Sequence, residues 1–465
     1  MSDALGTISD FVWGPWLLIP LLLLTGLYLT VVLRGVQFHK LTYSLWLALV
    51  KRKEVGGEGD VTHYQALATA LAATVGVGNI AGVATAIGIG GPGALFWMWL
   101  TGLVGMATKY AEAFLGVKYR RRDTAGEQSG GPMFYLRDGV GGSFGKVLGV
   151  AFAVFAAIAA FGIGNGAQAN TVADVMLDEF GLATWITGLV LTVGAGVVLI
   201  GGIKSIGRFA AAFVPLMAVI YLVAATVVLA ANAAEIPGAL GMIFSDAFTG
   251  TAATGGFAGA ALLTVIRMGV ARGIFSNESG LGTGGIAAAA AQTTNPVRQA
   301  LVSMTQTFLD TLVVVTFTGL TLVVTGVWTG EEEGATMTSA AFSQGLPGEW
   351  GSILVTISVA FFAFSTLLGW AYYGERNMDF LFGRKAVVPY RVVFIAVIFV
   401  GATADLDVVW TFSDIMNGLM ALPNLIGLLL LSGLIARETR AYLSRPDWKD
   451  VDAPGTTTGG DRPRS

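Results

Sequence analysis

The sequence lacks the residues that most metal and redox chemistry requires. Its 465 residues include no cysteine and two histidines. The absence of cysteine excludes disulfides, thiolate metal sites, iron–sulfur clusters and cysteine nucleophiles, and two histidines leave little for haem or zinc. Charge is also scarce: Asp, Glu, Lys and Arg make up 12% of the chain, about half the share typical of soluble proteins. No basic patch indicates nucleic acid, and we expect no organic cofactor.

What the sequence has in abundance is apolar surface. Hydrophobic residues make up 54% of the chain, glycine occurs 64 times, and the mean hydropathy is +0.71. Uncharged runs near 20 residues long predict membrane-spanning helices. We therefore expect an all-α polytopic protein of the lipid bilayer with eleven spans and no large soluble domain. The runs are 13–33, the two parts of 64–108 on either side of the Gly/Pro-rich 89–93, 147–173, 181–203, 209–234, 255–291, 298–327, 350–374, 387–403 and 408–435.

The charged residues divide the predicted loops into two sets. All Lys and Arg except Arg267 and Arg272 fall at one face, and the loops at the other face carry Asp and Glu without Lys or Arg. Basic loops stay in the cytoplasm, which predicts a plasma-membrane protein with an outside N-terminus and a cytoplasmic C-terminus. Arg267 and Arg272 either snorkel or lie at an aqueous edge. The segment 125–144 reads as a cytoplasmic loop or interfacial helix, and the polar tail from Pro446 as disordered.

The last ten predicted spans form two sets of five. Spans that start at 94, 147 and 181 in the first set correspond to spans that start at 299, 350 and 386 in the second set. Because five is odd, the second set must run inverted to the first. The predicted division is an N-terminal helix with a basic loop (1–63), a first repeat (64–235), an inverted second repeat (236–440) and a tail (441–465).

Two glycine-rich segments occupy matching places in these repeats. They are 74–79 (TVGVGN) and 275–285 (FSNESGLGTGG), and both disfavour a continuous helix. A broken helix in a membrane frees backbone groups that must line a cavity or bind something. Freed N–H groups suit a carboxylate and freed C=O groups suit a hard cation, so the pattern predicts a transport site at the midplane. The alternative is that these glycines only let helices pack closely.

Five motifs resemble the alanine/glycine:cation symporter family, and the resemblance covers about residues 10 to 440. They are 73–84 (ATVGVGNIAGVA), 91–99 (GPGALFWMW), 109–112 (KYAE), 130–133 (GGPM) and 273–282 (GIFSNESGLG). The resemblance implies a 5+5 inverted-repeat amino-acid transporter fold with one extra N-terminal helix. It also implies symport of alanine or glycine with Na⁺, with protons as a possible substitute.

The resemblance further implies roles for individual residues. The first break would receive the substrate carboxylate, and the second would line the pocket and meet the ammonium through C=O groups. Gln168 would accept from the ammonium or, alternatively, make a helix–helix hydrogen bond, and Trp370 would cap the pocket or simply pack. The implied substrate residues are Thr74, Gly76, Gly78, Asn79, Gln168, Phe275, Ser276, Asn277 and Trp370.

The implied Na⁺ site combines two backbone carbonyls, Ala72 and Val75, with the Ser365 and Thr366 hydroxyls. The same hydroxyls can instead bond to their own helix. Asp310, in mid-span, is either a proton site or the partner of Arg267 or Arg272 in an ion pair. Glu278 and Asp414 are buried acids without an assigned role.

Other functions stay open from the sequence. These are proton-coupled transport, another amino-acid substrate and a channel, although the repeat favours alternating access over a continuous pore. A membrane enzyme is disfavoured because His39 and His63 lie near loop ends and no cysteine is present. Alanine-versus-glycine preference and the oligomeric partner are not encoded in any motif.

Overall fold

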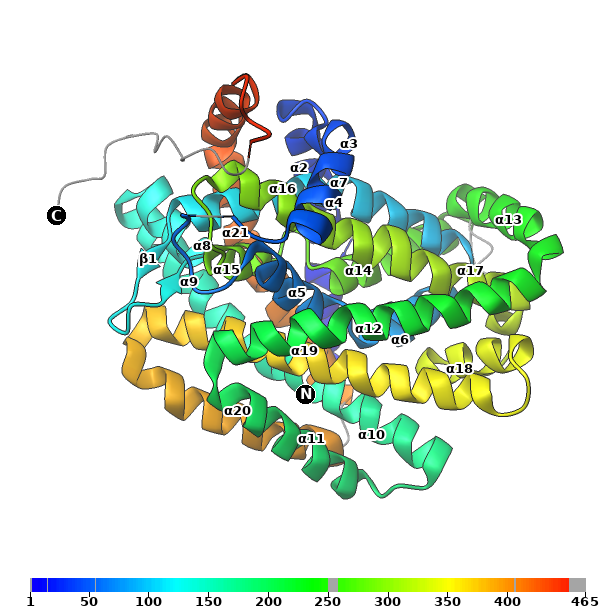
Figure 1. The fold of residues 1–465 in the computed structure, drawn as a ribbon. Helices are drawn as coiled ribbons and strands as arrows, with labels where there is room; N and C mark the ends of the chain where they lie inside the picture. The colour runs from blue at the N-terminus through cyan, green and yellow to red at the C-terminus, as the bar shows by residue number, and fades with distance from the viewer. Residues whose placement is uncertain (1, 15, 55, 250–257, 405–406, 451–465) are drawn as a thin grey trace.

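A computed structural model describes residues 2–14, 16–54, 56–249, 258–404 and 407–450. Most of these residues are helical, and the long helices α12 and α19 lie side by side across the molecule (Figure 1). The start of the run 255–291 and the tail beyond residue 450 lie outside the described residues. Residues 446–450 are described, and they are not the disordered segment that we expected: the Trp448 ring lies 4.8 Å from the Tyr43 ring.

The N-terminal part and the first predicted repeat contain the helices α1 to α12, most of which overlap the apolar runs. They are α1 (Ser2–Val12), α2 (Leu18–Val32), α3 (Val36–His39), α4 (Leu41–Trp46), α5 (His63–Thr74), α6 (Ala81–Gly90), α7 (Gly93–Lys118), α8 (Pro132–Phe134), α9 (Gly142–Phe161), α10 (Ala167–Phe180), α11 (Thr184–Ile200) and α12 (Gly202–Ala231). Wider π-helical turns occur at η1 (Leu47–Lys51), η3 (Tyr135–Val140) and η4 (Gly162–Gly166), and a 3₁₀ turn, η2 (Val77–Asn79), lies between α5 and α6.

The second predicted repeat has the same kind of interruptions. Its helices are α13 (Ile236–Thr249), α14 (Ala258–Asn277), α15 (Thr283–Ala289), α16 (Pro296–Thr307), α17 (Thr316–Thr325), α18 (Gly334–Gly345), α19 (Trp350–Phe382), α20 (Val387–Thr403) and α21 (Asp407–Leu443). A π-helical stretch, η6 (Phe308–Val315), joins α16 to α17, and short 3₁₀ turns are η5 (Ala233–Glu235), η7 (Val327–Thr329) and η8 (Arg384–Ala386).

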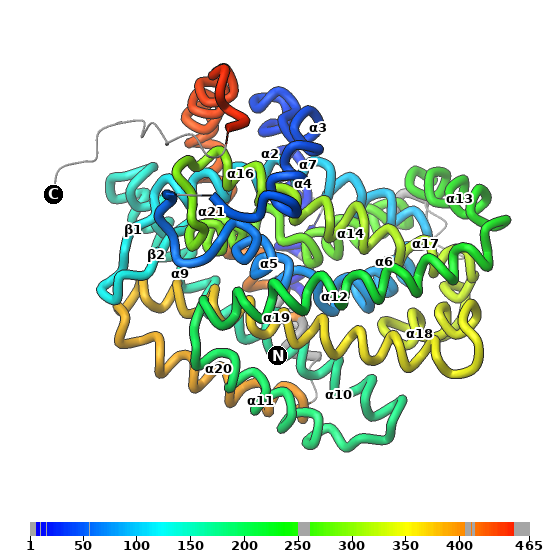
Figure 2. Tube along the Cα trace, viewed as in Figure 1, coloured from blue at the N-terminus to red at the C-terminus, as the bar shows by residue number. Residues whose placement is uncertain are grey.

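Each predicted run overlaps a helix or an interrupted helix. By length and composition, six helical stretches in the described residues suit a membrane crossing: 142–180, 202–231, 296–325, 350–382, 384–403 and 414–443. The finer count of eleven spans stays a prediction, and so do the repeat boundaries. The sequence reading did not anticipate α13 and α18, which lie at the end of the bundle far from β1 (Figure 2).

The segment 125–144 is more structured than a loop. Strands β1 (Arg121–Arg122) and β2 (Gln128–Ser129) form an antiparallel hairpin, with Arg121 opposite Ser129. After the hairpin, α8 and η3 bury Met133, Tyr135 and Leu136. The chain after the hairpin is therefore packed into this end of the bundle.

The outer helices carry apolar side chains on their exposed surfaces. On α11, Val190, Val197 and Ile200 are 65–77% exposed. On the adjacent α20, Val388 and Val392 are also largely exposed. Extended exposed apolar surface of this kind is typical of contact with lipid.

Candidate functional site

The first break begins where α5 ends at Thr74. A capping box at Thr62 and Gln65 starts this helix, and the helical hydrogen bonds stop at Val75. Beyond it, the Gly76 amide donates to Asn79 Oδ1 at 3.0 Å, and the Val77 amide donates to Gln168 Oε1 at 3.2 Å. These two contacts satisfy backbone groups that the break would otherwise leave without partners.

Glycine at position 76 is required by the approach of α19. A Cβ atom there would lie 2.4 Å from Thr366 Oγ1. Gly369 of the same helix packs equally closely on Ala73, since a Cβ on Gly369 would meet the Ala73 Cβ at 2.6 Å. The break therefore lies directly against α19.

The second break separates α14 from α15. Glu278 has φ +56°, and Gly280 and Gly282 have φ +98° and +89°, so the chain turns through the left-handed region that glycine adopts easily. The Gly280 and Gly282 amides both donate to Glu112 Oε1 at 2.9 Å. Asn424 Nδ2 donates to the same oxygen, also at 2.9 Å. A buried carboxylate on α7 thus takes the amides that this break frees.

The two breaks meet at a small closed cavity. Its volume is about 10 Å³, which is about the space that one water needs. Six of the nine predicted substrate residues line it: Thr74, Gly76, Gly78, Gln168, Phe275 and Trp370. Ala73, Ile163, Glu278 and Thr366 complete the lining. An amino acid would need the cavity to expand, so the structure represents a contracted site.

The other three predicted substrate residues lie behind the cavity, around Asp310. Asn79 Nδ2 donates to Asp310 Oδ1 at 2.7 Å, and Ser276 Oγ donates to Oδ2 at 2.7 Å. Thr311 Oγ1 donates to Asp310 Oδ2 at 2.8 Å and accepts from Asn277 Nδ2 at 3.1 Å. These residues join the two breaks to η6.

This arrangement differs from an ion pair between Asp310 and an arginine. The hydrogen-bond partners of the Asp310 carboxylate among the described residues are uncharged. Arg267 and Arg272 instead line a separate small cavity together with Asp414. The guanidinium carbon of Arg272 also lies 5.6 Å from the Phe275 ring centre.

Gln168 makes the helix–helix type of hydrogen bond in this structure. Its Oε1 accepts from Val77 N, and its Nε2 donates to the Ile163 carbonyl at 2.9 Å. Trp370 packs on the π turn η4, where a Cβ on Gly164 would lie 2.2 Å from the Trp370 Cβ. Both side chains nevertheless line the cavity.

Three of the four predicted cation ligands lie together beside the cavity. Ser365 Oγ and Thr366 Oγ1 are each 3.1 Å from the Ala72 carbonyl oxygen. Both hydroxyls also contact the Phe362 carbonyl, at 2.8 and 3.1 Å. The fourth, Val75, leaves the helical conformation with ψ +81°, and Thr366 also lines the substrate cavity.

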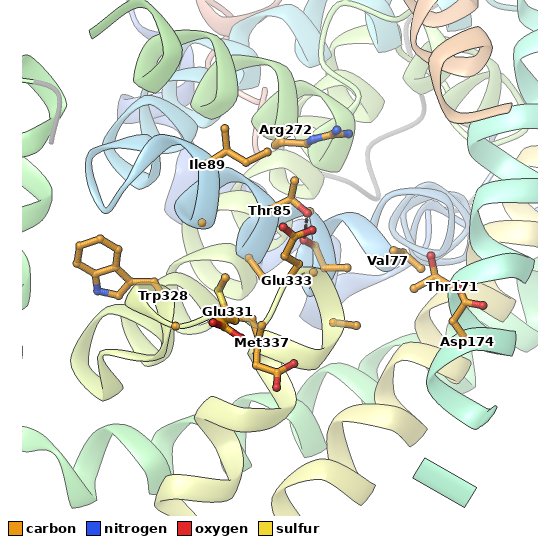
Figure 3. Close-up of a pocket in the computed structure, with 18 of the residues that line it drawn as sticks. Val77, Thr85, Ile89, Thr171, Asp174, Arg272, Trp328, Glu331, Glu333 and Met337 are labelled. Atoms are coloured by element: carbon orange, nitrogen blue, oxygen red, sulfur yellow. Dashed lines mark hydrogen bonds between the residues drawn. The ribbon is translucent and has the colours of Figure 1, made fainter. Parts of the chain in front are cut away.

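A larger cavity, which we call the vestibule, lies on the side that carries the acidic loops. Its volume is about 560 Å³, and Val77 and Phe275 line it, as do the acidic residues Asp174, Glu331, Glu332 and Glu333. Figure 3 shows Thr171 and Asp174 reaching it from α10, and Trp328 and Glu331 from the opposite wall. Phe275 lines both this vestibule and the closed cavity. We therefore regard the Phe275 ring as the partition between them.

Buried ion pairs hold the basic side of the bundle closed. Glu54 Oε1 lies 2.6 Å from Arg298 Nη1, and Glu54 Oε2 lies 3.0 Å from His63 Nε2. Burial by itself raises the pKa of the Glu54 carboxyl, but hydrogen bonds from His63 and Thr294 and the charge of Arg298 outweigh it and lower the pKa to about 2. A second cluster joins Arg376 and Arg384 to Asp123, at 3.2 and 2.9 Å.

One buried charged pair, Lys109 and Glu112, was not predicted from the sequence. Lys109 was counted with the basic cytoplasmic face and Glu112 was noted only as part of the motif KYAE, yet both side chains are fully buried, with Lys109 Nζ 3.7 Å from Glu112 Oε2. Lys109 Nζ also donates to the Glu278 carbonyl at 3.1 Å. The available signal was the spacing of three residues, which places both charges on one helix face.

Known proteins share these features over nearly the whole chain. The model of the sodium:alanine symporter family matches residues 1–453. The chain belongs to this family. A sodium/alanine symporter, AgcS, of Methanococcus maripaludis is 54% identical over 94% of this chain and 96% of its own length. A probable sodium/glutamine symporter, GlnT, of Bacillus subtilis is 36% identical over 95% of this chain and 91% of its own length.

A solved structure supports the fold. The crystal structure of MhsT in complex with L-phenylalanine matches with a TM-score of 0.59 and 13% sequence identity, over 83% of this chain and 99% of that chain. At this identity the likeness concerns the fold. A family member with this fold and several membrane-spanning helices is a transport protein, and not an enzyme.

Proposed function

We propose that this chain is a Na⁺-coupled symporter that imports alanine and glycine by alternating access. The observation that carries the proposal is the meeting of two helix breaks at a cavity that shares Thr366 with an oxygen cluster. Membership of the family and the 54% identity to a sodium/alanine symporter support the choice of ion and substrate. The name of the sodium/glutamine relative gives glutamine, which is larger than alanine. The size of the substrate pocket is therefore the feature to test.

The oxygen cluster suits a monovalent hard cation. Oxygen ligands about 2.4 Å from a cation at right angles lie about 3.4 Å from each other, close to the 3.1 Å separations here. Each hydroxyl has a single proton. When that proton goes to Phe362, the hydroxyl lone pairs and the Ala72 carbonyl face one another, and a cation between them removes the repulsion. Ala72, Val75, Ser365 and Thr366 are the ligands that we propose for Na⁺.

The cavity suits a small side chain. The bulky groups Phe275 and Trp370 bound it, and Trp370 has no room to retreat toward Gly164. The substrate carboxylate would replace Asn79 and Gln168 as acceptor for the amides of the first break, with Thr74, Gly76 and Gly78 around it. Ser276 and Asn277 would then support the pocket from behind through Asp310 and Thr311.

The two sides of the cavity fit an outward-facing contracted state. We propose that the acidic loops face the outside of the cell membrane and the basic loops face the cytoplasm, because basic loops are retained in the cytoplasm. The N-terminus would then be outside and the C-terminus inside. Alternating access requires the vestibule to close and the ion-paired side to open.

The experiment measures Na⁺ and alanine binding to the purified transporter, together with uptake into proteoliposomes. Because coupling free energy is reciprocal, Na⁺ should lower the Kd of alanine by the same factor by which alanine lowers the Kd of Na⁺. Thr366→Ala and Ser365→Ala should raise the Na⁺ midpoint by about tenfold, and Ser358→Ala, a buried hydroxyl elsewhere on α19, should leave it unchanged. An unshifted midpoint in both site variants would place the ion elsewhere. Uptake that is indifferent to Na⁺ but driven by a proton gradient would favour Asp310 as the coupling site, and passive flux without accumulation would indicate a channel.

A further inference from the structure

Glu278 stands apart among the residues that line the closed cavity. It is the ionisable residue in that lining, and it is 1% exposed. Its Oε2 accepts a hydrogen bond from Thr283 Oγ1 at 2.6 Å. Its left-handed backbone conformation, with φ +56°, is uncommon for a residue with a side chain. The backbone is therefore locally strained at the residue whose side chain brings a carboxylate to the substrate cavity.

The charges around Glu278 do not balance. Lys109 is the cation of this cluster, and it lies between the Glu112 carboxylate and the Glu278 backbone: its Nζ is 3.7 Å from Glu112 Oε2 and donates to the Glu278 carbonyl. Glu112 also receives two backbone amides and Asn424. Asp310, the next nearest acid, has its own uncharged donors. When both carboxyls are ionised, one ammonium leaves one negative charge, which is costly to bury without a partner.

Some of the backbone carbonyls at this break already have donors. The Asn277 carbonyl accepts from Gln306 Nε2 at 3.2 Å, and the Glu278 carbonyl accepts from Lys109 Nζ. These two carbonyls are therefore less available to accept hydrogen bonds from an ammonium group that enters the cavity. The Glu278 carboxylate is the strongest remaining acceptor, because a hydrogen bond between two charged groups is stronger than one to a neutral carbonyl.

We propose that the Glu278 carboxylate receives the ammonium group of the amino-acid substrate and selects zwitterions over amino-free anions of the same shape. This inference rests on the proposed function. The substrate then spans the cavity between two poles: the amides of the first break with the adjacent cation, and the carboxylate of the second break. Binding of a zwitterion supplies the positive charge that the Lys109, Glu112 and Glu278 cluster lacks.

The test compares alanine with L-lactate, in which a hydroxyl replaces the ammonium group. Both compounds compete with labelled alanine for the purified transporter at saturating Na⁺. Wild type should prefer alanine strongly. Glu278→Gln keeps the size and an acceptor for Thr283, and it should lower the alanine-over-lactate ratio by about tenfold to a hundredfold. Glu375→Gln, at a buried glutamate that pairs with Arg391 away from the cavity, should leave the ratio unchanged.

A ratio is informative because general damage weakens both ligands equally. A folded Glu278→Gln transporter with the wild-type ratio would overturn the inference and leave the proposed function intact, provided that wild type still binds alanine with Na⁺. A wild-type protein that binds no alanine would contradict both the inference and the proposed function. If Glu278→Gln does not fold, Thr283→Val is measured instead: it removes the hydroxyl that orients the carboxylate and should lower the ratio by threefold or more, and an unchanged ratio there counts against the inference.

Discussion

The two ends of the proposed transport path are closed by different physical means. On the acidic side, a vestibule of about 560 Å³ reaches Phe275, which also lines the small cavity. On the basic side, ion pairs centred on Glu54 and on Arg376 join loops and helices that are far apart in the sequence. Moving one aromatic ring needs little free energy, whereas separating buried charges needs several kcal/mol. The comparison indicates a gate that opens easily on the acidic side and a strong gate on the basic side.

The largest expected effect comes from breaking the strong gate at Glu54. Glu54→Gln removes the buried carboxylate that pairs with Arg298, and breaking a buried pair typically destabilises a protein by about 3–5 kcal/mol. Thermal unfolding of the purified protein should begin at a clearly lower temperature. The reaction rate of a single cysteine at Ser129, a buried position in β2 near Asp123, should rise, and no native cysteine will interfere.

Glu58→Gln is the matched control. Glu58 pairs with Arg122 at 3.6 Å, but both side chains are at least 60% exposed, and exposed pairs contribute about 0–1 kcal/mol. Equal destabilisation by the two variants would show that the Glu54 cluster is no stronger than a surface pair.

The same gate should respond to acid. Because the pKa of Glu54 is lowered from 4.5 to about 2, its contribution to stability is present above about pH 4.5 and is lost as the pH falls toward 2. The contribution is on the order of 3 kcal/mol. The difference in melting temperature between wild type and Glu54→Gln should be constant from pH 7 to 5 and should shrink steadily below pH 4.5. A difference that persists unchanged at pH 3 would contradict this account.

The smallest expected effect comes from opening the gate on the acidic side. Phe275→Ala joins the vestibule to the cavity and should weaken alanine binding by about 1–3 kcal/mol, the scale of a methylene-sized misfit. Valine and leucine should compete better than they do in wild type. Phe144→Ala removes an exposed ring on α9 and should change neither property. Unchanged selectivity in a folded Phe275→Ala transporter would show that the ring does not limit substrate size.

The sequence predicted the features that depend on local composition. Glycine and asparagine in 74–79 and 275–285 marked the two breaks, and the apolar runs marked the helices. The short helices α13 and α18 were not predicted because the spans were recognised by their length of about 20 uncharged residues. A short helix in a loop between spans does not need that length. The burial of Lys109 was missed because its carbonyl partner, Glu278, is 169 positions away. A charge near a helix end suggests an aqueous edge unless its distant partner is known.

The sequence also could not reveal how tightly the predicted site residues are engaged with each other. The Gly76 amide was expected to face the substrate, yet it donates to Asn79. The Gln168 amide oxygen was expected either to accept from the ammonium or to join helices, and here it holds the Val77 amide. Such choices depend on which state of the transport cycle is populated, and composition does not encode that.

The π-helical turns η4 and η6 have a consequence for comparing this chain with its relatives. A π turn holds one residue more than an α turn, so each is equivalent to a single insertion inside a helix. Residues after such an insertion are rotated by about 100° relative to an uninterrupted α-helix. Gln168 is the second residue after η4, and Asp310 lies within η6. A relative without these turns must therefore be aligned with a one-residue gap inside a helix, where alignment methods penalise gaps most, and a missing gap would assign both polar side chains to the wrong helix face.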